Sequence, residues 1–271
     1  MSDQSGFQIG ADAPTQYQEY VERFMLPFVD ALVAATVKRG DAVLDVACGT
    51  GFVTRAASRV VGSTGRVAGV DINPGMIAAA RALPVESDRP ITWHEGSALE
   101  LPFEDDEFDA VTCQQGLQFF PDQAAALAEM RRVSRSNALV GATVWAPHER
   151  SPYLAAQLDV LSRYCDLDLP RGQRLDVDGG DSTIGEWFRV AGLADVEVRE
   201  LEFLVEIPSL AEYIQSHMAA LPWGSDWFAL DDTTRAQATA EFVAALAQWH
   251  TPDGGAQVPF TSFLALGAVR P

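Results

Sequence analysis

The sequence predicts a doubly wound α/β protein, with helices on both faces of a mostly parallel sheet. Two observations lead to this fold class: short apolar runs alternate with longer helical runs, and turn residues separate them. Strands are expected at 42–46, 66–71, 91–94, 108–113 and 138–145. The helices between them are expected at 52–61, 74–83 and 123–133. This alternation is typical of a parallel sheet, because each helix returns the chain to the edge where the next strand starts.

Turn and capping residues support the borders of these elements. A glycine-flanked turn at 62–65 precedes the second strand. Asn73 followed by Pro74 is a typical helix start. The asparagine side chain can accept hydrogen bonds from free backbone N–H groups, and proline lacks an N–H that the first turn would leave unpaired.

An amphipathic helical segment is expected ahead of the sheet, within residues 1–40. It carries aromatic side chains at near-helical spacing: Tyr17, Tyr20, Phe24 and Phe28. The sheet domain then takes up residues 41–271 without an internal repeat or an extended linker. We expect helical insertions at about 147–192 and 209–257, which form a lid at the end of one sheet rather than a second core.

The pattern changes after Pro147. Helices are expected at 153–166, 211–220 and 232–249, and strands at 195–207 and 259–269. A polar loop is expected at 170–181. The segments 183–186 and 209–212 both have the form of a capping box, in which Ser or Thr is followed three residues later by Glu, so each predicts a helix start.

Composition narrows the classes of function. The chain has 271 residues and a formal net charge of −19, and such a field repels nucleic-acid backbones. Its densest basic group, Arg131, Arg132 and Arg135, lies at the end of a predicted helix, where cations favourably meet the helix dipole. Cys48, Cys113 and Cys165 are odd in number and lack a CxxC pair, so we expect buried or half-buried thiols and no metal site. Without an apolar leader or span, a cytoplasmic protein is expected.

The run from Val43 to Gly51 is the most informative stretch. It reads as a buried strand that ends in a glycine turn, with a helix directly after it. Such turns usually bind phosphate, because free N–H groups and the helix dipole attract anions. Asp45 places a negative charge at the same turn, which opposes a pyrophosphate and favours a ligand that carries positive charge. S-adenosylmethionine, with its ammonium and sulfonium groups, is such a ligand.

Together with this turn, four later segments resemble the class I S-adenosylmethionine-dependent methyltransferases. They are Asp71, twenty residues after Gly51; the run 71–76; Glu95-Gly96-Ser97-Ala98; and the run 113–122, which ends in Phe-Pro-Asp. The resemblance is strong over residues 42–145. The branch it points to is the small-molecule group related to ubiquinone and menaquinone biosynthesis enzymes. It implies a Rossmann-like, seven-stranded sheet with an antiparallel last strand.

The resemblance also implies roles for individual residues. Asp45 lies near the methionine amino group, Asp71 accepts both ribose hydroxyls, and Ile72 and Met76 flank the adenine. The complete set expected to bind S-adenosylmethionine, with S-adenosylhomocysteine as product, is Asp45, Ala47, Gly49, Gly51, Asp71, Ile72, Met76, Ser97, Ala98, Gln114 and Gln115. The residues expected in the substrate pocket are Gln118, His148, His217 and Trp223.

Three departures from the family pattern stand out. Ala47 replaces the first glycine of the turn, and Ser97 stands where an aspartate usually bonds the adenine amino group. The segment 134–137 replaces the Pro-Gly-Gly turn before the fifth strand. Asn137 tolerates the left-handed conformation, so that turn can survive.

The sequence leaves several points open. The cofactor activates the methyl group itself, so the protein must align the acceptor and exclude water. His148 and His217 are candidate bases, but a surface position is expected for each, and no catalytic base is assigned. The acceptor is expected to be a small, apolar or aromatic molecule. Alternatives are a relative that binds the cofactor without methylating, for example a ring-closing or isomerising enzyme, and a nicotinamide enzyme, against which Asp45 and Thr54 argue. Monomer and homodimer are both compatible with the sequence.

Overall fold

The structure, a computed structural model, describes residues 13–85, 90–165, 180–219, 221 and 223–270, without the side chains of 13–20 and 219. Its centre is a seven-stranded sheet in the order β3-β2-β1-β4-β5-β7-β6. The strands are β1 Ala42–Val46, β2 Arg66–Asp71, β3 Thr92–Glu95, β4 Phe108–Gln114, β5 Ser134–Trp145, β6 Ala194–Ile207 and β7 Ala256–Ala268. β7 runs antiparallel to both β5 and β6, and the pairs among β1 to β5 are parallel. The predicted seven-stranded sheet is confirmed.

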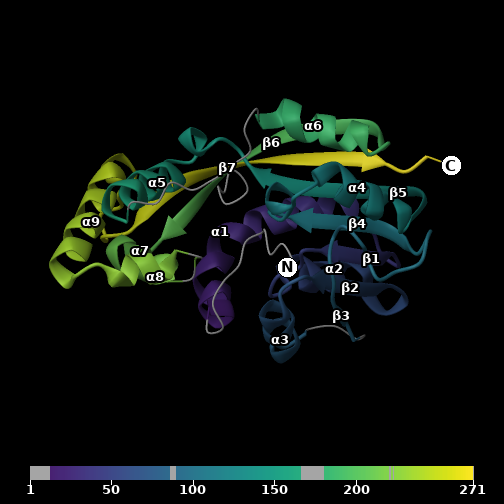
Figure 1. Ribbon diagram of the computed structural model, residues 1–271, viewed down its shortest axis with the longest axis horizontal. Helices are drawn as coiled ribbons and strands as arrows, with labels where there is room; N and C mark the ends of the chain where they lie inside the picture. Colours follow the sequence, from purple (N-terminus) through teal and green to yellow (C-terminus); the bar gives the residue numbers. More distant parts are fainter. Residues whose placement is uncertain (1–12, 86–89, 166–179, 220, 222, 271) are drawn as a thin grey trace.

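The helices lie in two layers and a separate group (Figure 1). They are α1 Ala13–Thr36, α2 Phe52–Val61, α3 Pro74–Ala82, α4 Gln123–Arg132, α5 Pro152–Tyr164, α6 Gly180–Val190, α7 Leu210–Ala219, α8 Gly224–Ala229 and α9 Asp232–Ala245. One core cluster joins α1 and α2 to one face of the sheet, and a second joins α4 and α6 to the other. β1 shows the alternation behind this division, because Val43 belongs to the first cluster and Leu44 and Val46 to the second.

The last two strands extend beyond the sheet. The pairing of β5 with β7 ends at Trp145 opposite Ser262, whereas β6 and β7 remain paired as far as Ile207 opposite Ala256. Helices α5, α7, α8 and α9, here called the lid, gather around this two-stranded extension (Figure 1). Their apolar side chains bury against it in the same cluster that holds α1. The lid therefore has no separate core.

Three local expectations were wrong. α6 begins at Gly180, so the capping box at 183–186 lies inside the helix. α6 also packs against β6, β7 and α4, so it covers the sheet and is no part of the lid. The strand expected at 138–145 begins earlier, at Ser134, although Asn137 adopts the left-handed conformation expected of it, at φ 70°. Most of the loop predicted at 170–181 lies outside the described residues.

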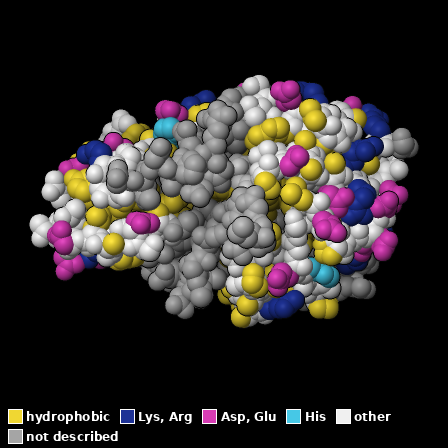
Figure 2. Space-filling view, viewed as in Figure 1, with side chains coloured by type: hydrophobic (Ala, Val, Ile, Leu, Met, Phe, Trp, Pro, Cys, Tyr) yellow, Lys and Arg dark blue, Asp and Glu magenta, His cyan; other side chains and the backbone are white. Residues whose placement is uncertain are grey.

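Charged side chains of both signs are mixed over the sheet part of the molecule (Figure 2). Arg132 pairs with Glu129 and Asp105, and Arg135 pairs with Asp109. These arginines thus hold the ends of α4, β4 and β5 together. Among the helices that the structure describes, none has the length and apolar character needed to cross a membrane.

Candidate functional site

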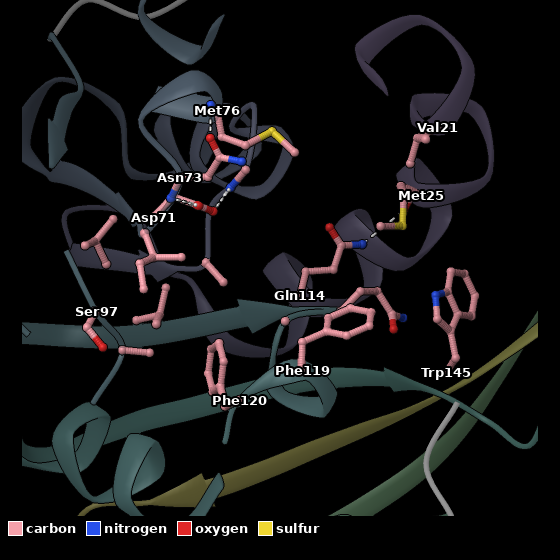
Figure 3. Close-up of a pocket in the computed structure, with 18 of the residues that line it drawn as sticks. Val21, Met25, Asp71, Asn73, Met76, Ser97, Gln114, Phe119, Phe120 and Trp145 are labelled. Atoms are coloured by element: carbon pink, nitrogen blue, oxygen red, sulfur yellow. Dashed lines mark hydrogen bonds between the residues drawn. The ribbon is translucent and has the colours of Figure 1, made fainter. Parts of the chain in front are cut away.

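A cavity of about 220 Å³ opens at the carboxyl ends of β1, β2 and β4. In open α/β sheets ligands bind at this edge, at the point where the connections that leave two neighbouring strands go to opposite sides of the sheet. Here β1 lies between β2 and β4 in the strand order β3-β2-β1-β4-β5-β7-β6. The cavity has two halves, which Figure 3 shows on either side of Gln114. The glycine half is lined by Ala47, Gly49, Asp71, Ile72, Met76, Ser97 and Ala98. The aromatic half is lined by Phe24, Met25, Phe119, Trp145, Leu154, His217 and Leu221.

Asp71 organises the glycine half. Its Oδ2 accepts a hydrogen bond from the backbone N–H of Gly49 at 2.8 Å, and its Oδ1 accepts one from that of Asn73 at 2.8 Å. A carboxylate oxygen has two lone pairs, so each can accept one more bond from a ligand in the cavity. Burial raises the pKa of Asp71, and the two backbone N–H groups oppose that rise.

The turn after β1 exposes its backbone to the cavity. Ala47 and Gly49 both adopt φ 54°, in the left-handed region. A methyl group added at Gly49 would have no heavy atom within 4 Å, so glycine leaves open space that a ligand can occupy. Gly51 differs: the same methyl would lie 2.4 Å from the Trp93 ring, so this glycine is required by packing.

Asp45 lies beneath the turn, in the wall of a second cavity of about 30 Å³. Met25, Ala47, Gly49 and Gln114 line both cavities, so the two adjoin. The Asp45 carboxylate accepts hydrogen bonds from Thr54 Oγ1 at 2.6 Å and from Thr112 Oγ1 at 3.2 Å. Burial raises the pKa of Asp45 to about 7, against the effect of these two hydroxyls. An adjacent cation would favour the ionised form.

Residues that follow β2 and β3 complete the glycine half. The Asn73 side chain caps α3 by accepting from the N–H groups of Gly75 at 2.8 Å and Met76 at 3.4 Å. This fixes the start of α3 and places Met76, a buried side chain, against the cavity. Ile72 lines the mouth and is 57% exposed, which is unusual for a large apolar side chain. Ser97 Oγ accepts from the N–H of Leu99 at 3.1 Å.

Four elements far apart in the sequence build the aromatic half. α1 contributes Phe24, and its Met25 carbonyl accepts a hydrogen bond from Gln114 Nε2 at 3.2 Å, which joins α1 to the end of β4 (Figure 3). The Phe24 ring stacks on Phe260 of β7, with 5.2 Å between centroids, and lies 5.9 Å from the Trp145 ring. Leu154 of α5 and His217 of α7 close the far end.

His217 is buried in the wall of this half, with 1% of its surface exposed. Its Nδ1 lies 3.0 Å from the Tyr153 hydroxyl oxygen. Burial lowers the pKa of His217 to about 3, so the imidazole is neutral at physiological pH. The expectation of a surface position was therefore wrong for His217, because the lid folds back over the end of the sheet. His148 is half-buried beside Glu149, at 3.4 Å, and lines neither cavity.

Comparison with known proteins agrees with this geometry. A family model described as a methyltransferase domain matches residues 43–137, the stretch that builds the glycine half. Residues 43–137 are therefore similar to a methyltransferase domain. A demethylmenaquinone methyltransferase of Staphylococcus aureus (strain MRSA252) is 43% identical to it over 104 residues. That alignment covers 38% of this chain and 43% of the relative, so the chain spans less than half the length of the curated relatives it matches.

Solved structures extend the likeness in fold beyond the matched stretch. The YcgJ protein of Bacillus subtilis superposes with a TM-score of 0.57 at 19% identity, covering 90% of this chain and 98% of that one. A phosphoethanolamine N-methyltransferase 2 of Haemonchus contortus, solved with phosphomonomethylethanolamine and S-adenosylhomocysteine, gives 0.59 at 18% identity. It covers 96% of this chain and 57% of its own. At these identities the likeness concerns the fold alone.

The fold brings most of the predicted site residues to one place. Ala47, Gly49, Asp71, Ile72, Met76, Ser97, Ala98, Gln114, Gln115 and His217 line the larger cavity, and Asp45 lines the smaller. Four predicted residues line neither: Gly51, Gln118, His148 and Trp223. The Gln118 side chain donates to Gln115 Oε1 at 3.3 Å, and Trp223 packs within the lid. Gln118 and Trp223 are close in sequence to lining residues, but their side chains do not reach the cavity wall.

Sequence reasoning missed the residues that α1, β5 and α5 bring to the site. They are Val21, Phe24, Met25, Trp145 and Leu154. Trp145 ends the fifth strand, and ligands of open α/β sheets bind beyond the carboxyl ends of the strands, so its position alone could have pointed to it. The aromatic spacing of α1 predicted an apolar face, but it carried no information about which end of the sheet that face covers.

Proposed function

We propose that the protein transfers a methyl group from S-adenosylmethionine to a small, apolar or aromatic acceptor. The observation that carries this proposal is the continuity of the cavity. One continuous space runs from the Asp71 carboxylate, past Gln114, to the ring of Trp145. A methyl donor in the glycine half and an acceptor in the aromatic half would meet beside Gln114.

The residues of the glycine half fit the proposed cofactor. Asp71 has a free lone pair on each oxygen for the two ribose hydroxyls, and Ile72 and Met76 offer apolar surface for an adenine ring. Gly49 leaves room for close approach to the backbone, and Asp45 lies in the adjoining cavity to balance an ammonium group. When bound, S-adenosylmethionine supplies a methyl group that its sulfonium already activates.

The chain's own contribution is to hold the acceptor in place and to keep water out. Phe24, Trp145 and Leu154 would pack against the acceptor, and α1 and α7 would cover it. Among the described residues that line the aromatic half, none is charged. An uncharged ring compound therefore fits better than a phosphate or an ammonium, each of which needs a charged partner when buried. The name of the Staphylococcus aureus relative, which specifies a quinone acceptor, accords with this class.

A second candidate, a cofactor-binding protein that does not methylate, draws support from one observation. Within the described wall of the aromatic half, His217 is the one side chain with an ordinary pKa near neutrality, and burial lowers that pKa to about 3. Such a group is a weak proton acceptor. An acceptor that must lose a proton would have to ionise without help from this wall, as an acidic phenol can.

Methyl-labelled S-adenosylmethionine separates the candidates. We expect label to pass to at least one member of a panel of phenols, quinone precursors, polyketides and amines, with Asp71→Ala as the inactive control. Calorimetry with S-adenosylhomocysteine should show binding, and calorimetry with NAD should show none. Binding of S-adenosylhomocysteine without transfer to any panel member would favour the second candidate, and binding of NAD alone would contradict both.

A further inference from the structure

The lid contains an unusual polar group: a histidine and a tyrosine that pair inside an aromatic cluster. Tyr153 of α5 and His217 of α7 are both buried, with 3.0 Å between hydroxyl oxygen and Nδ1. The Tyr153 ring is surrounded by the rings of Tyr213, Phe242 and Phe260, at centroid distances of 5.9, 4.9 and 5.6 Å. Within the described part of the chain, Nδ1 is the hydrogen-bond partner of the Tyr153 hydroxyl, and His217 Nε2 has no partner.

This arrangement determines where the imidazole proton lies. Burial raises the pKa of the Tyr153 hydroxyl well above its ordinary value, so that group keeps its proton. If the O–H donates to Nδ1, the neutral imidazole carries its own proton on Nε2. In the other tautomer Nδ1–H would donate to the hydroxyl oxygen, which would leave two groups without a partner among the described residues, the buried O–H and the Nε2 lone pair, whereas the first tautomer leaves only Nε2–H. The hydrogen-bond network therefore assigns the proton to Nε2.

A buried N–H without an acceptor is costly, and the site offers a reason for it. Leaving such a donor unpaired costs about 1–3 kcal/mol. The His217 ring forms part of the wall of the aromatic half, beside Phe24, whose ring it meets edge to face at 5.3 Å. The nearby amides of Gln114 and Gln115 already donate to Met25 O and Ser262 Oγ. His217 thus holds donor capacity that the fold does not use.

We propose that the Nε2–H group of His217 donates a hydrogen bond to an oxygen of the acceptor, so that the site selects uncharged ring compounds with a carbonyl or comparable oxygen. This inference rests on the proposed function and narrows its substrate class. His217 is a binding residue in this account, and Tyr153 is a positioning residue that sets its tautomer. We therefore expect the site to reject molecules that lack this oxygen, because the Nε2–H group of His217 would stay unpaired when they bind.

Nitrogen-15 NMR of the full-length labelled protein, saturated with S-adenosylhomocysteine, tests the tautomer directly. We expect the His217 signals to report a proton on Nε2, and Tyr153→Phe to populate both tautomers. His217→Gln, which keeps an amide donor, identifies the signals by their loss. A proton on Nδ1 in the unaltered protein would overturn the proposal, and this result does not depend on methyl transfer.

Two matched probes test the oxygen. 1-Tetralone and tetralin share a fused ring skeleton and differ in the carbonyl group. We expect 1-tetralone to shift the His217 Nε2 resonance and tetralin to leave it unchanged. In His217→Phe the dissociation constant of 1-tetralone should rise about five- to tenfold, as expected for one lost hydrogen bond, and that of tetralin should not rise.

His148→Phe is the matched control, because His148 lines neither cavity and should change neither affinity. Equal responses to both probes, or no response to either, would contradict the proposal. If His217→Phe fails to fold, the wild-type shifts and the Tyr153→Phe variant still decide the question. Failure of S-adenosylhomocysteine to bind, measured separately by calorimetry, would instead remove the proposed function.

Discussion

The two halves of the cavity are built in different ways. The glycine half comes from turns that directly follow β1, β2 and β3, and the backbone N–H groups of Gly49 and Asn73 hold its Asp71 carboxylate in place. The aromatic half comes from side chains of α1, β5, α5 and α7, more than 190 residues apart at the extremes. The first way of building a site suits a ligand, such as a cofactor, that many related proteins have in common. The second suits a ligand that differs from one protein to another, because side chains on helices can change without disturbing the sheet.

The largest expected effect tests whether the aromatic half is also structural. Phe24→Ala removes a buried ring that packs on Phe260, Trp145 and His217, so the free energy of unfolding should fall by about 3–5 kcal/mol in urea titrations. S-adenosylhomocysteine affinity should change little. Phe228→Ala, at a ring that is 51% exposed, should cost about 1 kcal/mol or less. Equal losses in the two variants would contradict the packing described for α1.

The next effect tests the glycine half. Asp71→Ala removes a carboxylate that holds Gly49 and Asn73 and is proposed to bind the ribose hydroxyls. Two charge-assisted hydrogen bonds at about 1.5 kcal/mol each predict a loss of S-adenosylhomocysteine affinity of roughly 100-fold, measured by calorimetry. Asp231→Ala removes a helix cap in the lid and serves as control. Unchanged affinity in Asp71→Ala would remove Asp71 from the site.

A pH series sharpens the role of Asp45. Its pKa of about 7 in the folded protein lies above the ordinary value of 3.8, so the unbound carboxyl is protonated below pH 7. If an ammonium group binds beside it, the ionised form is required. The affinity for S-adenosylhomocysteine should then fall as the pH drops below about 7, by at most about tenfold per unit. Asp45→Asn should flatten this profile.

The same pKa shift predicts the stability of the unbound protein. The unfolded chain releases the Asp45 proton near 3.8 and the folded protein near 7, so the contribution of Asp45 to stability falls as the pH rises through that window. Asp45→Asn should remove this fall, which urea titrations at pH 5 and pH 8 can measure. If the affinity for S-adenosylhomocysteine had the same pH profile in the wild-type protein and in Asp45→Asn, the assignment of Asp45 would be contradicted.

The smallest effect concerns the mouth of the cavity. Ile72 is 57% exposed, so Ile72→Ala should change the free energy of unfolding by no more than about 0.5 kcal/mol. If an adenine covers this side chain, S-adenosylhomocysteine affinity should fall about fivefold, for roughly 1 kcal/mol of lost apolar burial. Val190→Ala, at a similarly exposed residue on α6, should leave the affinity unchanged. A loss of stability without a loss of affinity in Ile72→Ala would indicate a purely structural side chain.

The sequence by itself determined where the strands and helices lie along the chain as far as Trp145. It also determined most residues of the glycine half. A strand followed by a glycine turn leaves few conformations open, so Asp45, Gly49 and Asp71 could be placed from their neighbours in the chain. The same local reasoning misjudged Gly51, whose missing side chain makes room for Trp93.

Only the tertiary structure decided the aromatic half. The burial of His217, the position of Phe24 and the absence of Trp223 from the cavity wall depend on how α1 and the lid pack against the extended pair β6 and β7. Capping and periodicity report whether a helix forms and which face is apolar. They do not report what that face will meet, because many distant surfaces offer nearly the same hydrophobic gain, and only the simultaneous packing of all of them selects one.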